Sequence, residues 1–318
     1  MAASDPVVIV SAARTPLGRF MGELSPLSAH KLGSHVIGAA LERAKLSPDR
    51  IDEVLMGCVL PAGQGQAPAR QAARGAGLPD ATGATTINKV CGSGMKATML
   101  AHDIINAGSA QIVLSGGMES MSNAPYLLAK ARGGYRAGHD RIIDHMMMDG
   151  LEDAYETGRS MGDFGEATAE AYQFTRADQD AYAMETLTRA RKAVEGGAFK
   201  AEIAPITVTE KAGPRVIAND EHPLKVDPAK IPSLKPAFRA GGTITGSLFR
   251  QCRRRRGADP DKTLAGGSRR PAEPRRDQGP RHPQPGTAMV HHRADPGDPE
   301  IARQGRLERR RCRSVRDQ

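Results

Sequence analysis

The residue with the clearest chemical potential is Cys91, which lies in the run VCGSGMKA. Gly92 and Gly94 follow it closely and let the backbone turn tightly, with no Cβ to keep a ligand away. The residues before Cys91 favour a strand and those after it a helix, so the cysteine is expected at the first turn of a helix. Unpaired N–H groups and the positive end of the helix dipole stabilise a thiolate there. A small buried cysteine at a turn is the ordinary alternative, but the glycines and the strand-to-helix junction favour a nucleophile.

The elements that must position Cys91 are short strands alternating with helices. Strands are expected over residues 6–13, 54–60, 85–90 and 111–114, and helices over 26–46, 67–76 and 95–105. The strands are rich in β-branched residues, and the first helix places its apolar residues on one face. This alternation predicts an α/β domain over residues 1–121, with a βαβαβ core and a mixed, mostly parallel sheet.

A different pattern over residues 122–246, with few β-branched runs and much Gly, Met and charge, predicts an inserted α+β loop subdomain. Its clearest element is a helix over 176–196, with Thr175 as N-cap and TRAD as a near capping box. The run GRSMG, at 158–162, fits the G-x-S-x-G pattern of hydrolase nucleophiles. No strand precedes it, so the strand–turn–helix context is missing and a hydrolase is not favoured.

Composition and charge narrow the class of protein. The four cysteines have no CxxC and no metal-ligand spacing, which argues against a disulfide framework or a metal site. No run is apolar enough to span a membrane, and the N-terminus has no signal or transit pattern, so a reducing, cytoplasmic location is expected. The net charge of +9 comes from residues 247–318, which hold 19 of the 45 Lys and Arg but 9 of the 36 Asp and Glu.

Several motifs together resemble the thiolase family, which comprises the acetyl-CoA acetyltransferases and the 3-ketoacyl-CoA thiolases. VCGSGMKA and SGGMESMSNAP resemble the segments around the family's nucleophile. SAARTPLGRFMGEL resembles its N-terminal strand and loop, and VLPAGQGQAPARQAA its dimer-interface loop. TRADQDAYA resembles the helix of its loop domain, and PAFRAGGTIT the return into the core. The resemblance is continuous from about residue 6 to residue 245.

The resemblance implies an acyltransferase that moves an acetyl or acyl group between coenzyme A thioesters through a Cys91 acyl-enzyme. Met161 and Phe238 match residues that line the family's pantetheine channel, and Gln66 and Arg70 match the loop that meets the other subunit. Acyl-CoA substrates and a homo-oligomer are therefore expected, with no metal and no further cofactor. Neither a membrane nor a nucleic acid is an expected partner. The backbone N–H of Cys91 suits one donor of an oxyanion hole.

After Thr245 the resemblance stops. The family's Asn-Glu-Ala-Phe motif, its activating histidine and its second, basic cysteine are not matched, and Cys252 and Cys312 lack the glycines that surround that cysteine. Runs such as QCRRRRGADPDK have no periodicity, so residues 247–318 are expected to be a disordered basic tail. Plausible codons for this tail, when they are translated one base later, give ASSANADGAAALILTK, which resembles the family's next strand. The tail is therefore interpreted as thiolase sequence in the wrong reading frame.

This tail has consequences and leaves alternatives open. A parallel sheet without its next strand has an open edge, which predicts low stability. Because the family's second half is not matched, little complete thiolase turnover is expected, and partial acylation of Cys91 stays open. A non-catalytic thiolase fragment that binds nucleic acid through the arginines is an alternative, although the tail has no interleaved aromatic residues and no recognisable nucleic-acid-binding motif. The other alternative is an α/β scaffold in which Cys91 is structural, and reactivity towards iodoacetamide at neutral pH separates it from a nucleophile.

Overall fold

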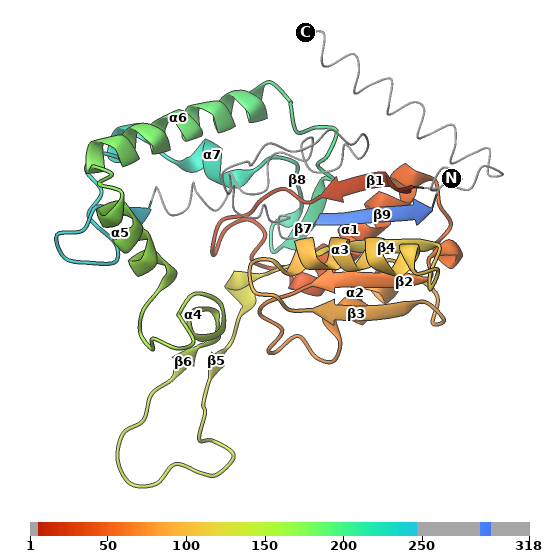
Figure 1. The fold of residues 1–318 in the computed structure, drawn as a ribbon, viewed down its shortest axis with the longest axis horizontal. Helices are drawn as coiled ribbons and strands as arrows, with labels where there is room; N and C mark the ends of the chain where they lie inside the picture. Colours follow the sequence, from red (N-terminus) through yellow and green to blue (C-terminus); the bar gives the residue numbers. More distant parts are fainter. Residues whose placement is uncertain (1–5, 247–286, 294–318) are drawn as a thin grey trace, which may run out of the picture.

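The computed structural model describes residues 6–246 and 287–293. Strands and helices alternate in the first part of the chain, from β1 to β4 (Figure 1). They are β1 (Val7–Arg14), α1 (Ala29–Ala44), η1 (Pro48–Arg50), β2 (Glu53–Gly57), α2 (Pro68–Gly75), β3 (Gly83–Ile87), α3 (Ser93–Asn106) and β4 (Ile112–Gly117). The predicted α/β alternation is confirmed, with boundaries that differ by a few residues.

A five-stranded sheet in the order β1-β9-β4-β2-β3 forms the centre of this part. β2 pairs in parallel with both β3 and β4, so that Glu53 lies opposite Gly83 on one side and Val113 on the other. β9 (Thr287–Arg293) runs antiparallel to both β1 and β4, which means that the other four strands share one direction. The sheet is therefore mixed and mostly parallel, as the sequence predicts.

The place of β9 differs from the sequence prediction. A disordered tail over 247–318 and an open sheet edge are expected, yet Thr287–Arg293 fills the position between β1 and β4. The prediction is wrong for this stretch. The segment has little strand signal of its own, but the backbone N–H and C=O groups of β1 and β4 pair with it and make it a strand. The rest of the predicted tail, 247–286 and 294–318, lies outside the described residues.

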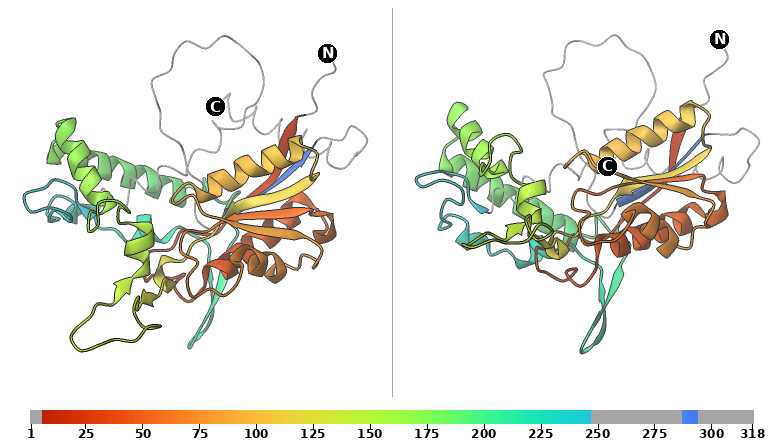
Figure 2. Two further views of the ribbon diagram at one scale, coloured as in Figure 1. Left: turned by 60° about the horizontal axis from the view of Figure 1, so that its bottom comes forward. Right: turned by 90° about the horizontal axis from the view of Figure 1, so that it is seen from below.

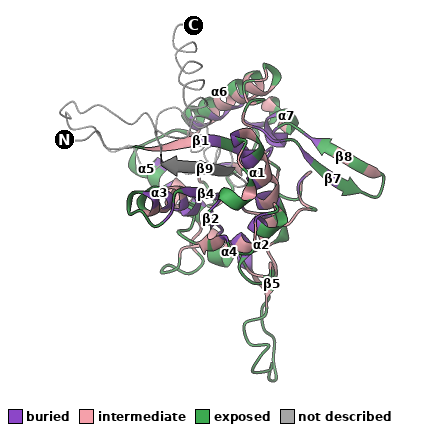
Figure 3. Ribbon diagram, turned by 90° about the vertical axis from the view of Figure 1, so that its right-hand side faces the viewer, coloured by how far each residue is buried: buried purple, intermediate pink, exposed green. Residues whose placement is uncertain are grey.

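Helices cover both faces of the sheet (Figure 2). Because side chains alternate along a strand, Val54 and Met56 of β2 belong to the core cluster shared with α1 and α2, whereas Leu55 belongs to the cluster shared with α3. The same alternation places Leu114 of β4 in the first cluster and Val113 in the second. This part is a three-layer α/β/α domain whose buried residues are concentrated around the sheet (Figure 3).

An inserted subdomain follows β4 and lies beside the sheet (Figure 1). Its elements are η2 (Met121–Asn123), β5 (Tyr126–Leu127), β6 (Ile143–Asp144), α4 (His145–Gly150), α5 (Met161–Ala171), α6 (Arg176–Glu195), β7 (Ile206–Glu210), β8 (Gly213–Ile217), α7 (Glu221–Lys225) and η3 (Pro228–Lys230). β5 pairs with β6 and β7 with β8, each as an antiparallel hairpin apart from the main sheet. The predicted α+β insertion is thus present.

Helix caps explain where two of these helices begin. α6 begins where the sequence predicts, because Thr175 and Asp178 form a reciprocal capping box. α5 is not predicted, and it begins inside GRSMG, where Ser160 is the N-cap and Asp163 completes a second capping box. Ser160 therefore caps a helix and does not occupy a hydrolase-type turn between a strand and a helix.

Buried charges fasten the subdomain to the core. The Arg14 guanidinium, at the end of β1, lies 2.8 Å from Asp220 and 2.6 Å from Glu202. Arg43 of α1 donates hydrogen bonds to the carbonyl oxygens of Ala12 and Ile203, which joins the same two parts. Across residues 6–246, no helix has the length and apolar character that crossing a membrane requires.

Candidate active site

Cys91 lies between β3 and α3, beyond the carboxyl end of β3. The inserted subdomain lies beside the sheet (Figure 1). β3 ends at Ile87 and α3 begins at Ser93, so the cysteine precedes the helix by one short turn. The residue is exposed. In open α/β sheets this edge, beyond the carboxyl ends of the strands, is where ligands bind. The predicted strand–cysteine–helix unit is confirmed, and its cysteine lies at the surface of the described part of the chain.

Glycines allow the start of α3 to approach the sheet closely. A Cβ on Gly57, the last residue of β2, would lie 2.5 Å from the Gly94 nitrogen and 2.7 Å from the Ser93 Cβ. A Cβ on Gly117, the last residue of β4, would lie 3.4 Å from the Gly94 Cα. Any side chain at Gly57 would therefore push the helix, and Cys91 with it, away from the strands.

Local hydrogen bonds shape the turn before Cys91. The Asn88 side chain accepts a hydrogen bond from the Val90 N–H at 2.9 Å, and the Gly92 N–H donates to the Lys89 carbonyl at 3.0 Å. Val90 has a φ of +46°, a left-handed conformation that is a genuine outlier for a β-branched residue. The sequence predicts Val90 as the end of a strand, and that prediction is wrong because the turn, rather than β propensity, determines its backbone.

The second described cysteine, Cys58, has a different environment. It is 1 % exposed, and its thiol lies 3.6 Å from a carboxylate oxygen of Glu119. Burial, followed by the charge of Glu119, raises the pKa of Cys58 to about 12. The Glu119 carboxylate also accepts hydrogen bonds from the Val59 and Leu60 N–H groups, and burial raises its pKa. Cys58 therefore stays a neutral thiol at physiological pH, and Cys91 is the exposed one of these two cysteines.

The two predicted channel residues belong to distant segments that the subdomain brings together. Met161 is the first residue of α5, and a Cβ on the adjacent Gly162 would lie 2.2 Å from the Phe238 ring. The Phe238 ring thus packs directly against the first turn of α5. One turn later, the buried Glu166 carboxylate accepts a hydrogen bond from the Ile244 N–H at 2.9 Å, which holds the segment that carries Phe238.

The two predicted interface residues lie near the start of α2. Gln66 is exposed, and its carbonyl accepts a hydrogen bond from the Gln71 side chain at 2.7 Å. Arg70 donates to the carbonyl oxygens of Asp80 and Thr82, just before β3. Arg70 therefore supports the approach to the edge strand from within the same chain, and a contact of either residue with another subunit stays a prediction.

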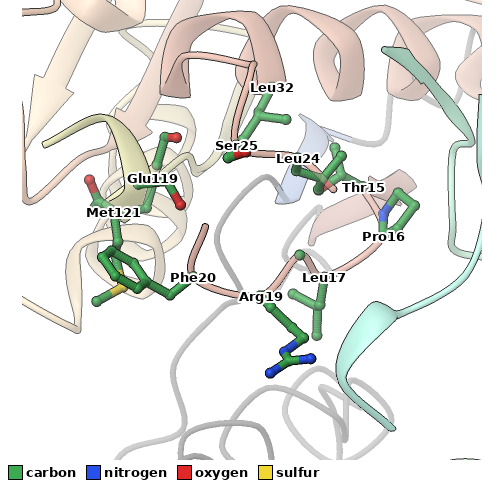
Figure 4. A pocket seen from close by; sticks show the side chains of 13 residues that line it. Thr15, Pro16, Leu17, Arg19, Phe20, Leu24, Ser25, Leu32, Glu119 and Met121 are labelled. Atoms are coloured by element: carbon green, nitrogen blue, oxygen red, sulfur yellow. The ribbon is translucent and has the colours of Figure 1, made fainter. Parts of the chain in front are cut away.

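A pocket of about 140 Å³ lies between the loop at residues 15–25 and the segment at 119–122 (Figure 4). Glu119 is part of its wall. None of the predicted site residues lines this pocket. It is therefore separate from the candidate site.

The sequence alone does not predict the hydrogen bonds of the Ser93 hydroxyl to Lys89 and Val90, in the turn before Cys91, or the packing of Phe238 against Gly162. A serine between glycines at a helix start is a candidate for local bonds to the backbone, and that signal is present in CGSG. No local signal exists for Gly162, because its importance comes from Phe238, which follows far along the chain.

The fold and site define an α/β protein with an exposed cysteine at a strand-to-helix turn and a subdomain inserted after β4. A family model for the thiolase N-terminal domain matches residues 7–251. The chain belongs to the thiolase family.

Relatives that bear an activity in their names match the same part of the chain. It is 50 % identical to acetyl-CoA acetyltransferase 2 of Arabidopsis thaliana over 242 residues, 75 % of this chain and 60 % of that protein. It is 46 % identical to acetyl-CoA acetyltransferase of Schizosaccharomyces pombe over 243 residues, 76 % of this chain and 61 % of that protein. The solved acetyl-CoA acetyltransferase of Syntrophomonas wolfei superposes with a TM-score of 0.71 at 40 % identity, covering 76 % of this chain and 60 % of that one. The chain thus spans about 60 % of the length of these relatives.

Proposed function

We propose that this protein transfers acyl groups from coenzyme A thioesters to Cys91, the first half of a thiolase reaction. The observation that carries the proposal is the exposed Cys91 at the turn before α3. Membership of the thiolase family and the names of relatives that are 46 % to 50 % identical support it.

The chemistry needs few groups. The Cys91 thiolate attacks the thioester carbonyl carbon, so a new C–S bond forms and the carbonyl π electrons move onto oxygen. The tetrahedral intermediate then collapses and expels the thiolate of coenzyme A, while the proton that Cys91 lost goes to solvent. Sulfur replaces sulfur, so the two thioesters are close in energy, and stabilisation of the oxyanion is the main task of the protein. The proposal requires no metal and no cofactor besides the coenzyme A thioester.

The remaining site residues receive finer assignments under the same proposal. Met161 and Phe238 form an apolar wall for the pantetheine arm. The packing of the Phe238 ring against Gly162, the residue after Met161, supports this assignment. Gln66 and Arg70 lie at the surface that meets a second copy in a homo-oligomer. An exposed thiol nucleophile needs a reducing compartment, and we assign the cytoplasm, although relatives in Xenopus laevis, Bos taurus and Homo sapiens are named as mitochondrial.

The Arg-rich segment offers the alternative of nucleic-acid binding. Its arginines lie almost wholly in 247–286 and 294–318, outside the described residues. No contact in the structure therefore favours that alternative over acyl transfer.

The test is incubation of the full chain with isotopically labelled acetyl-CoA, followed by peptide mapping. The label is expected on the Cys91 peptide, and it is expected to disappear in a Cys91→Ala variant. A Cys58→Ala variant is the matched control and should keep the label, because Cys58 is buried. Labelling that spreads equally over all cysteines, or that is absent from Cys91 while iodoacetamide still modifies it, would refute the proposal.

A further inference from the structure

The Ser93 side chain is bound to the turn that precedes Cys91. Its hydroxyl oxygen accepts a hydrogen bond from the Lys89 N–H at 2.8 Å and donates one to the Val90 carbonyl oxygen at 2.6 Å. The Ser93 N–H donates a second hydrogen bond, of 3.0 Å, to the same Val90 oxygen. Ser93 is 3 % exposed, so water does not compete strongly for these bonds. One side chain thus closes the turn from both ends.

These bonds determine the orientation of the peptide group that joins Val90 to Cys91. The group is planar and trans, so its C=O and N–H point in opposite directions. Because Ser93 holds the Val90 oxygen with two hydrogen bonds, the Cys91 N–H points away from Ser93. That N–H is the group that would meet the oxyanion, which forms on the carbonyl oxygen of the acyl group when the Cys91 sulfur bonds to its carbon.

The conformation of Val90 makes this arrangement dependent on Ser93. Val90 is held at a φ of +46°, which a β-branched side chain disfavours. Its side chain is 52 % exposed, so packing does not hold the residue in place. The Ser93 hydroxyl holds the Lys89 N–H before Val90 and the Val90 carbonyl oxygen after it. Without that hydroxyl, rotation about the N–Cα bond of Val90 would relieve its strained φ, shift the Val90–Cys91 peptide group and turn the Cys91 N–H out of its position.

We propose that Ser93 is a positioning residue for acyl transfer: it orients the Val90–Cys91 peptide group so that the Cys91 N–H can stabilise the oxyanion of the acyl group. The inference rests on the proposed function, since it assigns a task within that reaction. Acylation needs the oriented N–H, because the carbonyl electrons move onto oxygen as the new C–S bond forms. Alkylation by iodoacetamide also needs the thiolate, but it displaces iodide and forms no oxyanion.

The test compares these two reactions at Cys91 in the full chain, measured by mass spectrometry of the Cys91 peptide. p-Nitrophenyl acetate is the acylating probe, because it forms the same oxyanion without a coenzyme A site, and iodoacetamide is the alkylating probe. In Ser93→Ala the acylation rate is expected to fall about tenfold or more. This is less than the roughly 10²–10³-fold cost of removing an oxyanion donor outright, because the Cys91 N–H is displaced and not removed. The alkylation rate is expected to stay within a small factor of the original, so the ratio of the two rates falls.

Further variants separate positioning from folding. Thr98→Ala removes another hydroxyl of α3, which donates to the Gly94 carbonyl at 3.2 Å, and the ratio should not change. Val90→Gly in the Ser93→Ala background should restore part of the ratio, because glycine adopts a positive φ without strain. If Ser93→Ala does not fold, Asn88→Ala serves instead. Asn88 is exposed and holds the Val90 N–H, so its loss should lower the ratio in the same direction.

Each outcome is decisive for one of the two proposals. A ratio that stays constant in Ser93→Ala, or equal losses in both rates, would overturn the positioning role. If p-nitrophenyl acetate gives the expected ratios while acetyl-CoA never labels Cys91, the positioning role stands and the proposed coenzyme A function fails.

Discussion

Replacing Asp220 with alanine should strongly destabilise the contact between the subdomain and the core. The Arg14 guanidinium donates to both carboxylate oxygens of Asp220, at 2.8 and 3.1 Å, and the Leu17 N–H donates to the same carboxylate at 2.8 Å. Arg14 and Asp220 are both buried. Burial disfavours the charged guanidinium, but hydrogen bonds and charge attraction to Asp220 and Glu202 together more than offset this, and the pKa of Arg14 is raised. The substitution therefore leaves a buried cation with only the partly exposed Glu202 as an acidic partner.

The size of the effect follows from that environment. Removing one partner of a buried ion pair costs about 3–5 kcal/mol. For a described region of this size, about 2–4 °C of melting temperature is lost per kcal/mol, so a drop of about 6–20 °C is expected. Replacing both partners, as in Arg14→Met with Asp220→Leu, should cost less than Asp220→Ala alone, because no unpaired charge remains buried.

Urea unfolding followed by circular dichroism at 222 nm measures this prediction, since the chain has no tryptophan to report by fluorescence. Glu156→Ala is a matched control that removes an exposed ion pair with Arg159 and should change stability by less than about 1 kcal/mol. If Asp220→Ala costs no more than this control, or if the double replacement costs the sum of the two single ones, the ion pair does not hold the subdomain.

Three further predictions concern the site, the buried thiol and the gene. Gly162→Ala should lower the free energy of unfolding by about 1–3 kcal/mol, because its Cβ would overpack the Phe238 ring. Gly165→Ala in the same helix, whose Cβ would meet Ile244 at an ordinary 3.7 Å, should raise it by up to about 1 kcal/mol. Equal effects of the two substitutions in urea unfolding would contradict the packing argument. Folding keeps the Cys58 proton up to a pKa of about 12, against 9.0 for the ordinary group, so its contribution to stability is present below pH 9 and is lost as the pH rises towards 12. Cys58→Ala should flatten that part of the curve of stability against pH, and an unchanged slope of this curve would contradict the prediction. Nucleotide sequencing across codon 246 should reveal a shift that restores the thiolase frame, and a gene with no such alternative frame would end that interpretation.

Sequence reasoning predicts a helix correctly where residues close to its start, such as a capping box, determine where it begins. α6 begins at Arg176 as predicted, because its capping box is complete within four residues of sequence. α5 is missed because Gly162 and Gly165 weaken its helix propensity. Its first turn is supported instead by the Phe238 ring, which contacts it only in the folded chain.

Non-local pairing accounts for what the sequence does not predict. Thr287–Arg293 becomes β9 through its register with β1 and β4, two strands far away in sequence. Val90 has the propensity of a strand residue, but the hydrogen bonds of Ser93 and Asn88 impose a left-handed conformation. In the site, the position of Cys91 follows from its glycine-rich motif, whereas the orientation of its peptide group depends on bonds that the structure alone reveals.

The central claim is that Cys91 accepts an acyl group from coenzyme A, and the most direct measurement is the stoichiometry of acetyl-CoA labelling in the native chain. We expect up to one acetyl group per chain, located on the Cys91 peptide and released as acetyl-CoA when free coenzyme A is added back. An accessible Cys91 that alkylates readily yet carries no acetyl group at saturating acetyl-CoA would contradict the account.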